Sequence, residues 1–172
     1  MLTELRGAFE PIRRLLMSNI MVWINSTLVV VDMQPAFFPE IDTDVLTQVA
    51  NEIRRAMRLG RAIVIVETNP HKYGSTFRSL LDLTAGYHRV AFARKRGMDG
   101  SRSVAKVCRR RGFDRRHFDV CGVYTHYCVE ETAIGLGLRC PRSQVRVIKK
   151  ACADPGGNNW PAFPTRANVC VV

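Results

Sequence analysis

Short runs of β-branched residues alternate with stretches of helical periodicity, and this alternation limits the folds open to the chain. Residues 27–32 (TLVVVD) and 62–67 (AIVIVE) have the unbroken apolar character of strands that are buried on both faces. One apolar helical face lies between them and is formed by Val45, Val49, Ile53 and Met57. A strand, a helix and a second strand in this order predict a parallel pair of strands joined by a crossover.

The same order continues to the end of the chain and indicates an α/β protein. Strands are expected near residues 89–93, 118–123, 144–149 and 168–172, and helices near 76–85, 101–112 and 127–138. Cap signals bound two of the helices: Asp42 or Thr43 with Gly60, and Ser101 with Gly112. We expect a three-layer α/β/α fold with a mostly parallel, six-stranded, Rossmann-like sheet. The ligand site of such a sheet lies at the carboxyl ends of its strands.

The chain has 172 residues, enough for one domain with a sizeable core. We expect residues 25–172 to form this domain and residues 1–24 to form a helical N-terminal extension. No apolar run approaches the roughly 20 residues that span a bilayer, so no membrane segment is predicted. Six cysteines, with neither a Cys-x-x-Cys pair nor zinc-finger spacing, favour a reducing, cytoplasmic setting.

The formal net charge is +11 and is carried largely by arginine. Such an excess favours polyanions or acidic small molecules as partners. The basic residues are spread along the chain, however, with little aromatic interleaving and no nucleic-acid-binding motif. A solvated, arginine-rich surface is therefore preferred to specific nucleic-acid binding.

Three reactive side chains fall at or after the ends of predicted strands. Asp32 closes the first strand, Lys95 follows the third, and Cys128 follows the fourth. Each also has an ordinary interpretation: a turn or capping residue for Asp32, a solvated basic edge for Lys95, and a small buried residue for Cys128. Because the carboxyl ends of parallel strands share one edge of the sheet, we expect an acid, a base and a thiol to converge there.

Two segments around these residues are distinctive: residues 29–39 (VVVDMQPAFFP) and residues 121–133 (CGVYTHYCVEETA). The first resembles the first-strand signature of the isochorismatase-like cysteine hydrolases, a superfamily that includes nicotinamidases. The second resembles the nucleophile segment of that superfamily, and residues 89–95 look like the strand that delivers its lysine. The resemblance extends over roughly residues 27–172.

The resemblance implies a catalytic site. Cys128, in the first turn of its helix, would be the nucleophile, with its thiolate stabilised by the helix dipole. Asp32 would be the general base, and Lys95 would hold the Asp32 carboxylate in place and charged. The backbone N–H groups of Tyr124 and Cys128 would form the oxyanion hole, after a cis peptide bond that precedes Tyr124.

The resemblance also assigns Phe37, Tyr124 and Thr125 to substrate binding. A core position is the alternative for Phe37, whereas Gln34 and Thr125 match motif positions that support turns. By the same resemblance, the chain is expected to form a homo-oligomer, either a dimer or a tetramer.

The metal ligands of nicotinamidases are missing from the corresponding region. Residues 40–60 contain no histidine, and His71 is a lone candidate after the second strand. A lone histidine is more often a surface residue than a ligand, so we expect neither a metal nor a cofactor. His126 lies only two residues from Cys128 in the same tight turn, where their side chains should diverge.

The sequence predicts a metal-independent cysteine hydrolase that cleaves a C–N bond of a small amide, ureide or carbamoyl compound through a thioester. One alternative is isochorismatase-like hydrolysis of a small anionic substrate. Another is a non-catalytic binding or scaffolding protein with the same fold.

Overall fold

The computed structural model describes residues 25–38 and 44–172. Within them, six strands form one sheet in the order β3-β2-β1-β4-β5-β6, and each strand runs parallel to its neighbours. The strands are β1 (Thr27–Val31), β2 (Ala62–Thr68), β3 (Val90–Lys95), β4 (His117–Val123), β5 (Gln144–Ala153) and β6 (Val169–Val171). The expected N-terminal extension, residues 1–24, lies outside the described residues, as do Asp42 and Thr43.

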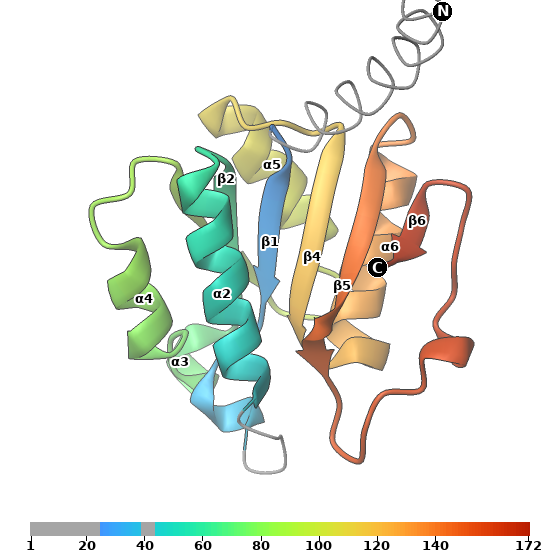
Figure 1. Cartoon of the computed structure of the whole chain (residues 1–172), viewed down its shortest axis with the longest axis horizontal. Helices are drawn as coiled ribbons and strands as arrows, with labels where there is room; N and C mark the ends of the chain where they lie inside the picture. Colours follow the sequence, from blue (N-terminus) through green and yellow to red (C-terminus); the bar gives the residue numbers. More distant parts are fainter. Residues whose placement is uncertain (1–24, 39–43) are drawn as a thin grey trace, which may run out of the picture.

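Helices cover both faces of the sheet. The helices α2 (Asp44–Arg58) and α4 (Arg78–Thr84) lie on one face, and α5 (Ser101–Arg111) and α6 (Glu130–Arg139) lie on the other (Figure 1). The shorter elements are η1 (Pro35–Phe37), α3 (Pro70–Tyr73), η2 (Thr125–Val129) and η3 (Trp160–Ala162). The predicted three-layer α/β/α fold is confirmed, and its sheet is parallel throughout.

The core follows from the apolar patterning. Every residue of β1 and β2 is buried, because both strands lie in the interior of the sheet with helices on each face. The α2 helix turns Val45, Val49 and Ile53 onto this sheet, as their spacing predicts. Burial of side chains of this size stabilises the fold by roughly 1.5–3 kcal/mol each.

Local boundaries differ from expectation at three places. Gly100, not Ser101, occupies the N-cap of α5, and the Ser101 N–H group donates to Asp99 Oδ1 at 2.7 Å. The segment that carries Cys128 is a π-helical turn, η2, which precedes α6, rather than the first turn of one α-helix. The β5 strand continues to Ala153, and its pairing with β4 shifts register between Val120 and Gly122.

The strand order reverses between β1 and β4. From β1 the chain builds outward through β2 to β3, then returns to place β4 on the other side of β1. Gly122 of β4 lies directly opposite Val31 of β1 at this point, with φ of 123°. A Cβ atom there would lie 2.0 Å from the Val31 carbonyl oxygen, so no side chain is tolerated. Ligand sites in open α/β sheets form beside such a reversal.

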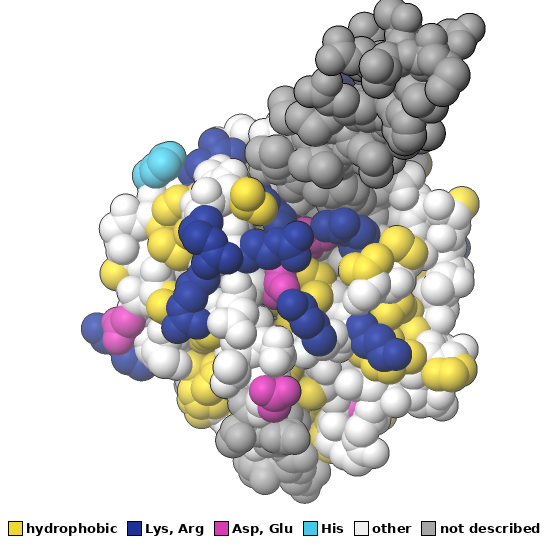
Figure 2. Space-filling view, in the orientation of Figure 1, with side chains coloured by type: hydrophobic (Ala, Val, Ile, Leu, Met, Phe, Trp, Pro, Cys, Tyr) yellow, Lys and Arg dark blue, Asp and Glu magenta, His cyan; other side chains and the backbone are white. Residues whose placement is uncertain are grey.

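Lysine and arginine side chains gather on the face that carries α2 and β5 (Figure 2). Among the described residues, no helix is both long enough and apolar enough to span a membrane.

Candidate active site

Four adjacent strands contribute to one polar cluster at the carboxyl edge of the sheet. Lys95 is the last residue of β3, Thr68 the last of β2, and Asp32 directly follows β1. Cys128 lies in η2, directly after β4. The three residues that sequence reasoning expected to converge are therefore brought together, and Thr68 joins them.

The ammonium group of Lys95 connects the acid to the thiol. Its Nζ lies 2.7 Å from Asp32 Oδ2, 3.1 Å from Cys128 Sγ and 3.0 Å from the carbonyl oxygen of Gly97. An ammonium group has three N–H donors, so each donor has an acceptor. The side chains of Lys95 and Asp32 are only 2% and 1% exposed. Burial strengthens this pair because little water screens it.

Asp32 is oriented from several directions. The Thr68 hydroxyl lies 3.0 Å from each carboxylate oxygen of Asp32. The backbone of Asp32 has φ of 51°, in the left-handed region that residues other than glycine seldom adopt. Its N–H group still donates to the carbonyl of Val66 at 2.9 Å, which holds this turn against β2. Such a backbone conformation persists only where its surroundings fix it, and it is enriched at functional sites.

The environment of Cys128 keeps its thiol protonated at neutral pH. Burial and the negative charge of Asp32 raise the pKa of Cys128 to about 11, although the charge of Lys95 acts in the opposite direction. The expected resting thiolate is therefore disfavoured at neutral pH. Proton removal from Sγ has to accompany any nucleophilic attack at neutral pH.

The turn between β4 and Cys128 is held by its own backbone. The Val123–Tyr124 peptide bond is cis, which confirms the expectation from the family resemblance. The Tyr124 carbonyl accepts hydrogen bonds from the N–H groups of Tyr127 at 3.2 Å and Val129 at 3.0 Å. The Tyr124 hydroxyl donates to the carbonyl of Phe37 at 2.9 Å, which joins this turn to the segment after β1.

A cavity of about 550 Å³ opens above the polar cluster. Its polar lining includes Asp32, Thr68, Cys128 and Arg96, and its apolar lining includes Phe37, Tyr73, Met98, Val123, Tyr124, Tyr127 and Pro155. The ring of Phe37 lies 5.0 Å from that of Tyr73 and 6.0 Å from that of Tyr124. Phe37 therefore lines the cavity and is not a core residue.

Two residues near the turn have other contacts. Thr125, which the family resemblance also assigns to substrate binding, is fully buried, and its hydroxyl donates to Asn158 Oδ1 instead of lining the cavity. This contact fits the turn-supporting role that its motif position suggested. The His126 side chain diverges from Cys128, as expected: its Nε2 accepts a hydrogen bond from the Asn159 N–H at 3.2 Å.

Sequence reasoning missed Thr68 and Tyr73. A hydroxyl at the end of the second strand was a usable signal for Thr68, because that strand lies next to the one that ends in Asp32. Gln34 gives a further tie, since its side chain accepts from the Thr68 N–H at 2.8 Å and donates to the Thr68 carbonyl at 3.0 Å. Tyr73 belongs to the short α3 helix, which no periodicity could reveal.

The cluster does not have the donor set of a metal site. Across residues 25–38 and 44–172, no group of three His, Cys, Asp or Glu side chains is placed to hold an ion.

All six cysteines are free thiols, and Cys121 and Cys152 are buried in the core. Burial raises the pKa of Cys152 to about 12, so this thiol is far less reactive than an exposed one.

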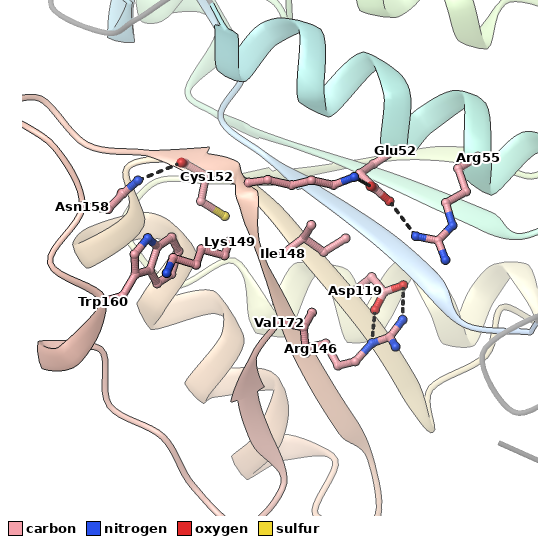
Figure 3. A pocket seen from close by; sticks show the side chains of 11 residues that line it. Glu52, Arg55, Asp119, Arg146, Ile148, Lys149, Cys152, Asn158, Trp160 and Val172 are labelled. Atoms are coloured by element: carbon pink, nitrogen blue, oxygen red, sulfur yellow. Dashed lines mark hydrogen bonds and ion pairs between the residues drawn. The ribbon is translucent and has the colours of Figure 1, made fainter. Parts of the chain in front are cut away.

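A second cavity, of about 650 Å³, lies between α2 and β5 (Figure 3). Lys150 Nζ lies 3.1 Å from Glu52 Oε1 at its wall, and Arg146 forms two hydrogen bonds with Asp119, of 2.8 and 3.0 Å. Asp119 also bonds the buried Arg61. Within the described part of the chain, Glu52 Oε2 has no hydrogen-bond partner and lies 3.8 Å from Arg55 Nη1. The polar cluster around Cys128 does not border this cavity.

Residues 26–171 match the Isochorismatase domain, and the chain therefore belongs to this family of hydrolases. No protein of curated function is similar enough in sequence to count as a match.

Solved structures with the same fold include three proteins of different description. The nicotinamidase PncA from Bacillus subtilis is 15% identical, with 86% of this chain and 98% of that chain covered and a TM-score of 0.67. The MAR1 ribonuclease from Caenorhabditis elegans is 22% identical, with coverage of 75% and 65% and a TM-score of 0.65. The YcaC product from Escherichia coli, an octameric hydrolase of unknown specificity, is 14% identical, with coverage of 76% and 65% and a TM-score of 0.63. The chain thus covers slightly less than two thirds of MAR1 and of YcaC, and at these identities the likeness establishes the fold.

Proposed function

We propose that the protein is a cysteine hydrolase that cleaves a C–N bond of a small amide, ureide or carbamoyl compound. One observation carries the proposal: a single buried ammonium group, Lys95 Nζ, contacts both the Asp32 carboxylate and the Cys128 sulfur. Nucleophilic acyl transfer requires a thiol and a general base in contact beside a substrate cavity. Cys128 and Asp32 supply these two groups, and Lys95 connects them. Membership of the isochorismatase domain family supports the same class of reaction.

The first half-reaction forms a thioester. As Sγ of Cys128 bonds to the substrate carbonyl carbon, its proton passes to the Asp32 carboxylate, because the thiol is protonated at rest. Lys95 stabilises the negative charge that develops on sulfur. When the tetrahedral intermediate collapses, the C–N bond breaks, and the proton on Asp32 moves to the departing nitrogen as ammonia or an amine.

The second half-reaction restores the enzyme. A water molecule gives one proton to Asp32 and attacks the thioester carbon, the C–S bond breaks, and Cys128 recovers a proton from Asp32. The net reaction is hydrolysis of one C–N bond by one water. Both intermediates place negative charge on the former carbonyl oxygen, and we assign its stabilisation to the backbone N–H groups of Tyr124 and Cys128.

The aromatic lining of the cavity suits a substrate whose main part is planar or apolar. Phe37, Tyr73, Tyr124 and Tyr127 surround the approach to the thiol. Aromatic side chains of this kind favour flat groups through stacked or edge-on contacts.

Ammonia release from a panel of small amides, ureides and carbamoyl compounds tests the proposal. We expect Cys128→Ala to abolish turnover and Asp32→Asn to reduce it by about 10²–10⁴-fold, the usual contribution of a positioned general base. Cys170→Ala is the matched control, because Cys170 is an exposed free thiol. Amidase activity that survives in Cys128→Ala would refute the thioester route and favour isochorismatase-like hydrolysis without the thiol. Absence of turnover across the panel would favour a binding or scaffolding role.

We also propose that the protein self-associates. The YcaC product, which shares the fold, is described as octameric. Light scattering across a range of protein concentrations is expected to give a dimer or a larger assembly, and a monomer at every concentration would contradict this.

A further inference from the structure

A basic hollow adjoins the catalytic cavity at the outer edge of the sheet. It has a volume of about 720 Å³ and shares Arg96 with the catalytic cavity. Its other walls come from Asn69 and the start of α3, from the end of β3, from Asp99 and from the first turn of α5. A ligand that entered the catalytic cavity past Arg96 would therefore extend into this basic hollow.

The hollow carries an excess of unneutralised positive charge. Arg94, Arg96 and Arg102 are exposed, and none of them forms an ion pair or a side-chain hydrogen bond within residues 25–38 and 44–172. Asp99 is the single acidic side chain among its lining residues. Its Oδ1 already accepts the Ser101 N–H at 2.7 Å, and its Oδ2 lies 3.5 Å from Arg139.

The position of Arg102 raises the local potential further. It lies in the first turn of α5, an 11-residue helix whose first turn contains no acidic residue. The amino end of a helix carries positive partial charge, so an arginine there is electrostatically unfavourable unless an anion is present. Repulsion among three arginines and a helix terminus is relieved when a carboxylate or phosphate binds between them.

We propose that this hollow binds a carboxylate or phosphate group of the substrate, whose amide end lies over Cys128. This inference rests on the proposed function and narrows it to amides of planar compounds that carry a negatively charged substituent. The aromatic side chains of the catalytic cavity hold the planar body, and Arg96 contacts the charged group where the two cavities meet. Arg94 and Arg102 complete the anion site, and the field of the three arginines speeds the approach of anionic substrates.

Three related amides test this specificity: benzamide, 3-carbamoylbenzoate and 3-carbamoylphenyl phosphate. We expect kcat/KM to be higher for the charged compounds, and the preferred compound tells a carboxylate from a phosphate ligand. Arg96→Gln and Arg102→Gln should raise KM for the charged amides about ten-fold or more, the loss expected for a charge-assisted hydrogen bond. In Arg102→Gln, turnover of bound substrate and all values for benzamide should stay within about two-fold, because Arg102 lines only the basic hollow and acts on the charged substituent.

Arg110→Gln is the matched control. It removes the same charge from an exposed position in the last turn of α5, roughly 12 Å along the helix axis from Arg102. Screening over about 8 Å at physiological ionic strength makes its effect on the hollow small. An equal rise of KM in Arg110→Gln would show that overall charge, and not the hollow, selects the substrate.

A second readout separates this inference from the proposed chemistry. Alkylation of Cys128 by iodoacetamide is followed by mass spectrometry, with and without 3-carbamoylphenyl phosphate. Protection in the wild-type protein that is lost in Arg96→Gln supports the anion site even if no ammonia is released, in which case the proposed hydrolysis fails. Equal turnover of all three amides, with no effect of Arg96→Gln, would overturn the anion site and leave the hydrolysis intact. Protection by an RNA oligomer at far lower concentration than by the phosphorylated amide would also overturn it, in favour of a polyanion.

Discussion

Lys95 Nζ lies 3.1 Å from Cys128 Sγ. The same nitrogen neutralises the buried Asp32 carboxylate, and in the proposed reaction it also stabilises the charge that develops on sulfur. Lys95 is therefore the buried charge partner of Asp32 in the folded protein, beside the role that we propose for it in the reaction.

Removal of the Lys95 charge is expected to destabilise the protein. Lys95→Met leaves the Asp32 carboxylate buried without its cation. This change is expected to lower the free energy of unfolding by about 3–5 kcal/mol. Urea denaturation measures the loss, and Lys106→Met, at an exposed position of α5, is the control, with a change within about 0.5 kcal/mol. The double variant Lys95→Met/Asp32→Asn should recover part of the loss. If the double variant is no more stable than Lys95→Met, the ion pair is not the source of the effect.

Asp32→Asn is expected to separate thiol reactivity from hydrolysis. The Asp32 charge contributes to the raised pKa of Cys128, so its removal lowers that pKa and enlarges the thiolate population at pH 8. Iodoacetamide should then label Cys128 faster than in the wild-type protein, while ammonia release falls by about 10²–10⁴-fold. Slower labelling in the variant would indicate that Asp32 does not act on the thiol through its charge.

Stability should fall in alkaline solution because of buried thiols. Burial raises the pKa of Cys108 and Cys152 from 9.0 to about 12, so the folded state retains protons that the unfolded state loses. This contribution is fully present below pH 9 and is lost as the pH rises toward 12, by up to about 1.4 kcal/mol per pH unit for each thiol. Cys152→Ala should reduce the slope of unfolding free energy against pH, measured by urea denaturation. The exposed Cys170→Ala should leave that slope unchanged, and equal slopes in all three proteins would contradict the assignment.

The Asp119 ion pairs are expected to matter for stability and not for thiol reactivity. Asp119 is 1% exposed and bonds Arg61, which is 2% exposed, as well as Arg146. Asp119→Ala leaves Arg61 buried without a counter-ion, at a cost of about 3–5 kcal/mol. Under native conditions the alkylation rate of Cys128 should be that of the wild-type protein. A loss of unfolding free energy below about 1 kcal/mol would show that water replaces the carboxylate readily.

The sequence could predict the fold because one signal repeats along it. Strands such as β1 and β2 are apolar without interruption, and only a parallel sheet covered on both faces buries such strands. The ends of β5 and the turn η2 were less predictable, because the register shift opposite Gly122 and the π-helical turn depend on contacts between distant segments.

The convergence of the candidate site residues was predictable from the sequence, and their environment was less so. Asp32, Lys95 and Cys128 were marked by residue type and strand position, and the cis bond before Tyr124 by the family resemblance. The raised pKa of Cys128 was not foreseen, because it depends on how deeply neighbouring elements bury the sulfur. The basic hollow was hidden for a similar reason, since Arg94, Arg96 and Arg102 also suit an ordinary solvated surface.

The backbone contact between Gly122 and Val31 limits which residues of this protein can be replaced, whether by evolution or by design. Main chain touches main chain there, between the strand that leads to the acid and the strand that leads to the thiol. The separation of these two groups is thus independent of the side chains around the cavity mouth, including Met98 and Pro155. We therefore expect that replacement of residues at the cavity mouth changes which ligands fit and leaves the spacing between Asp32 and Cys128 unchanged.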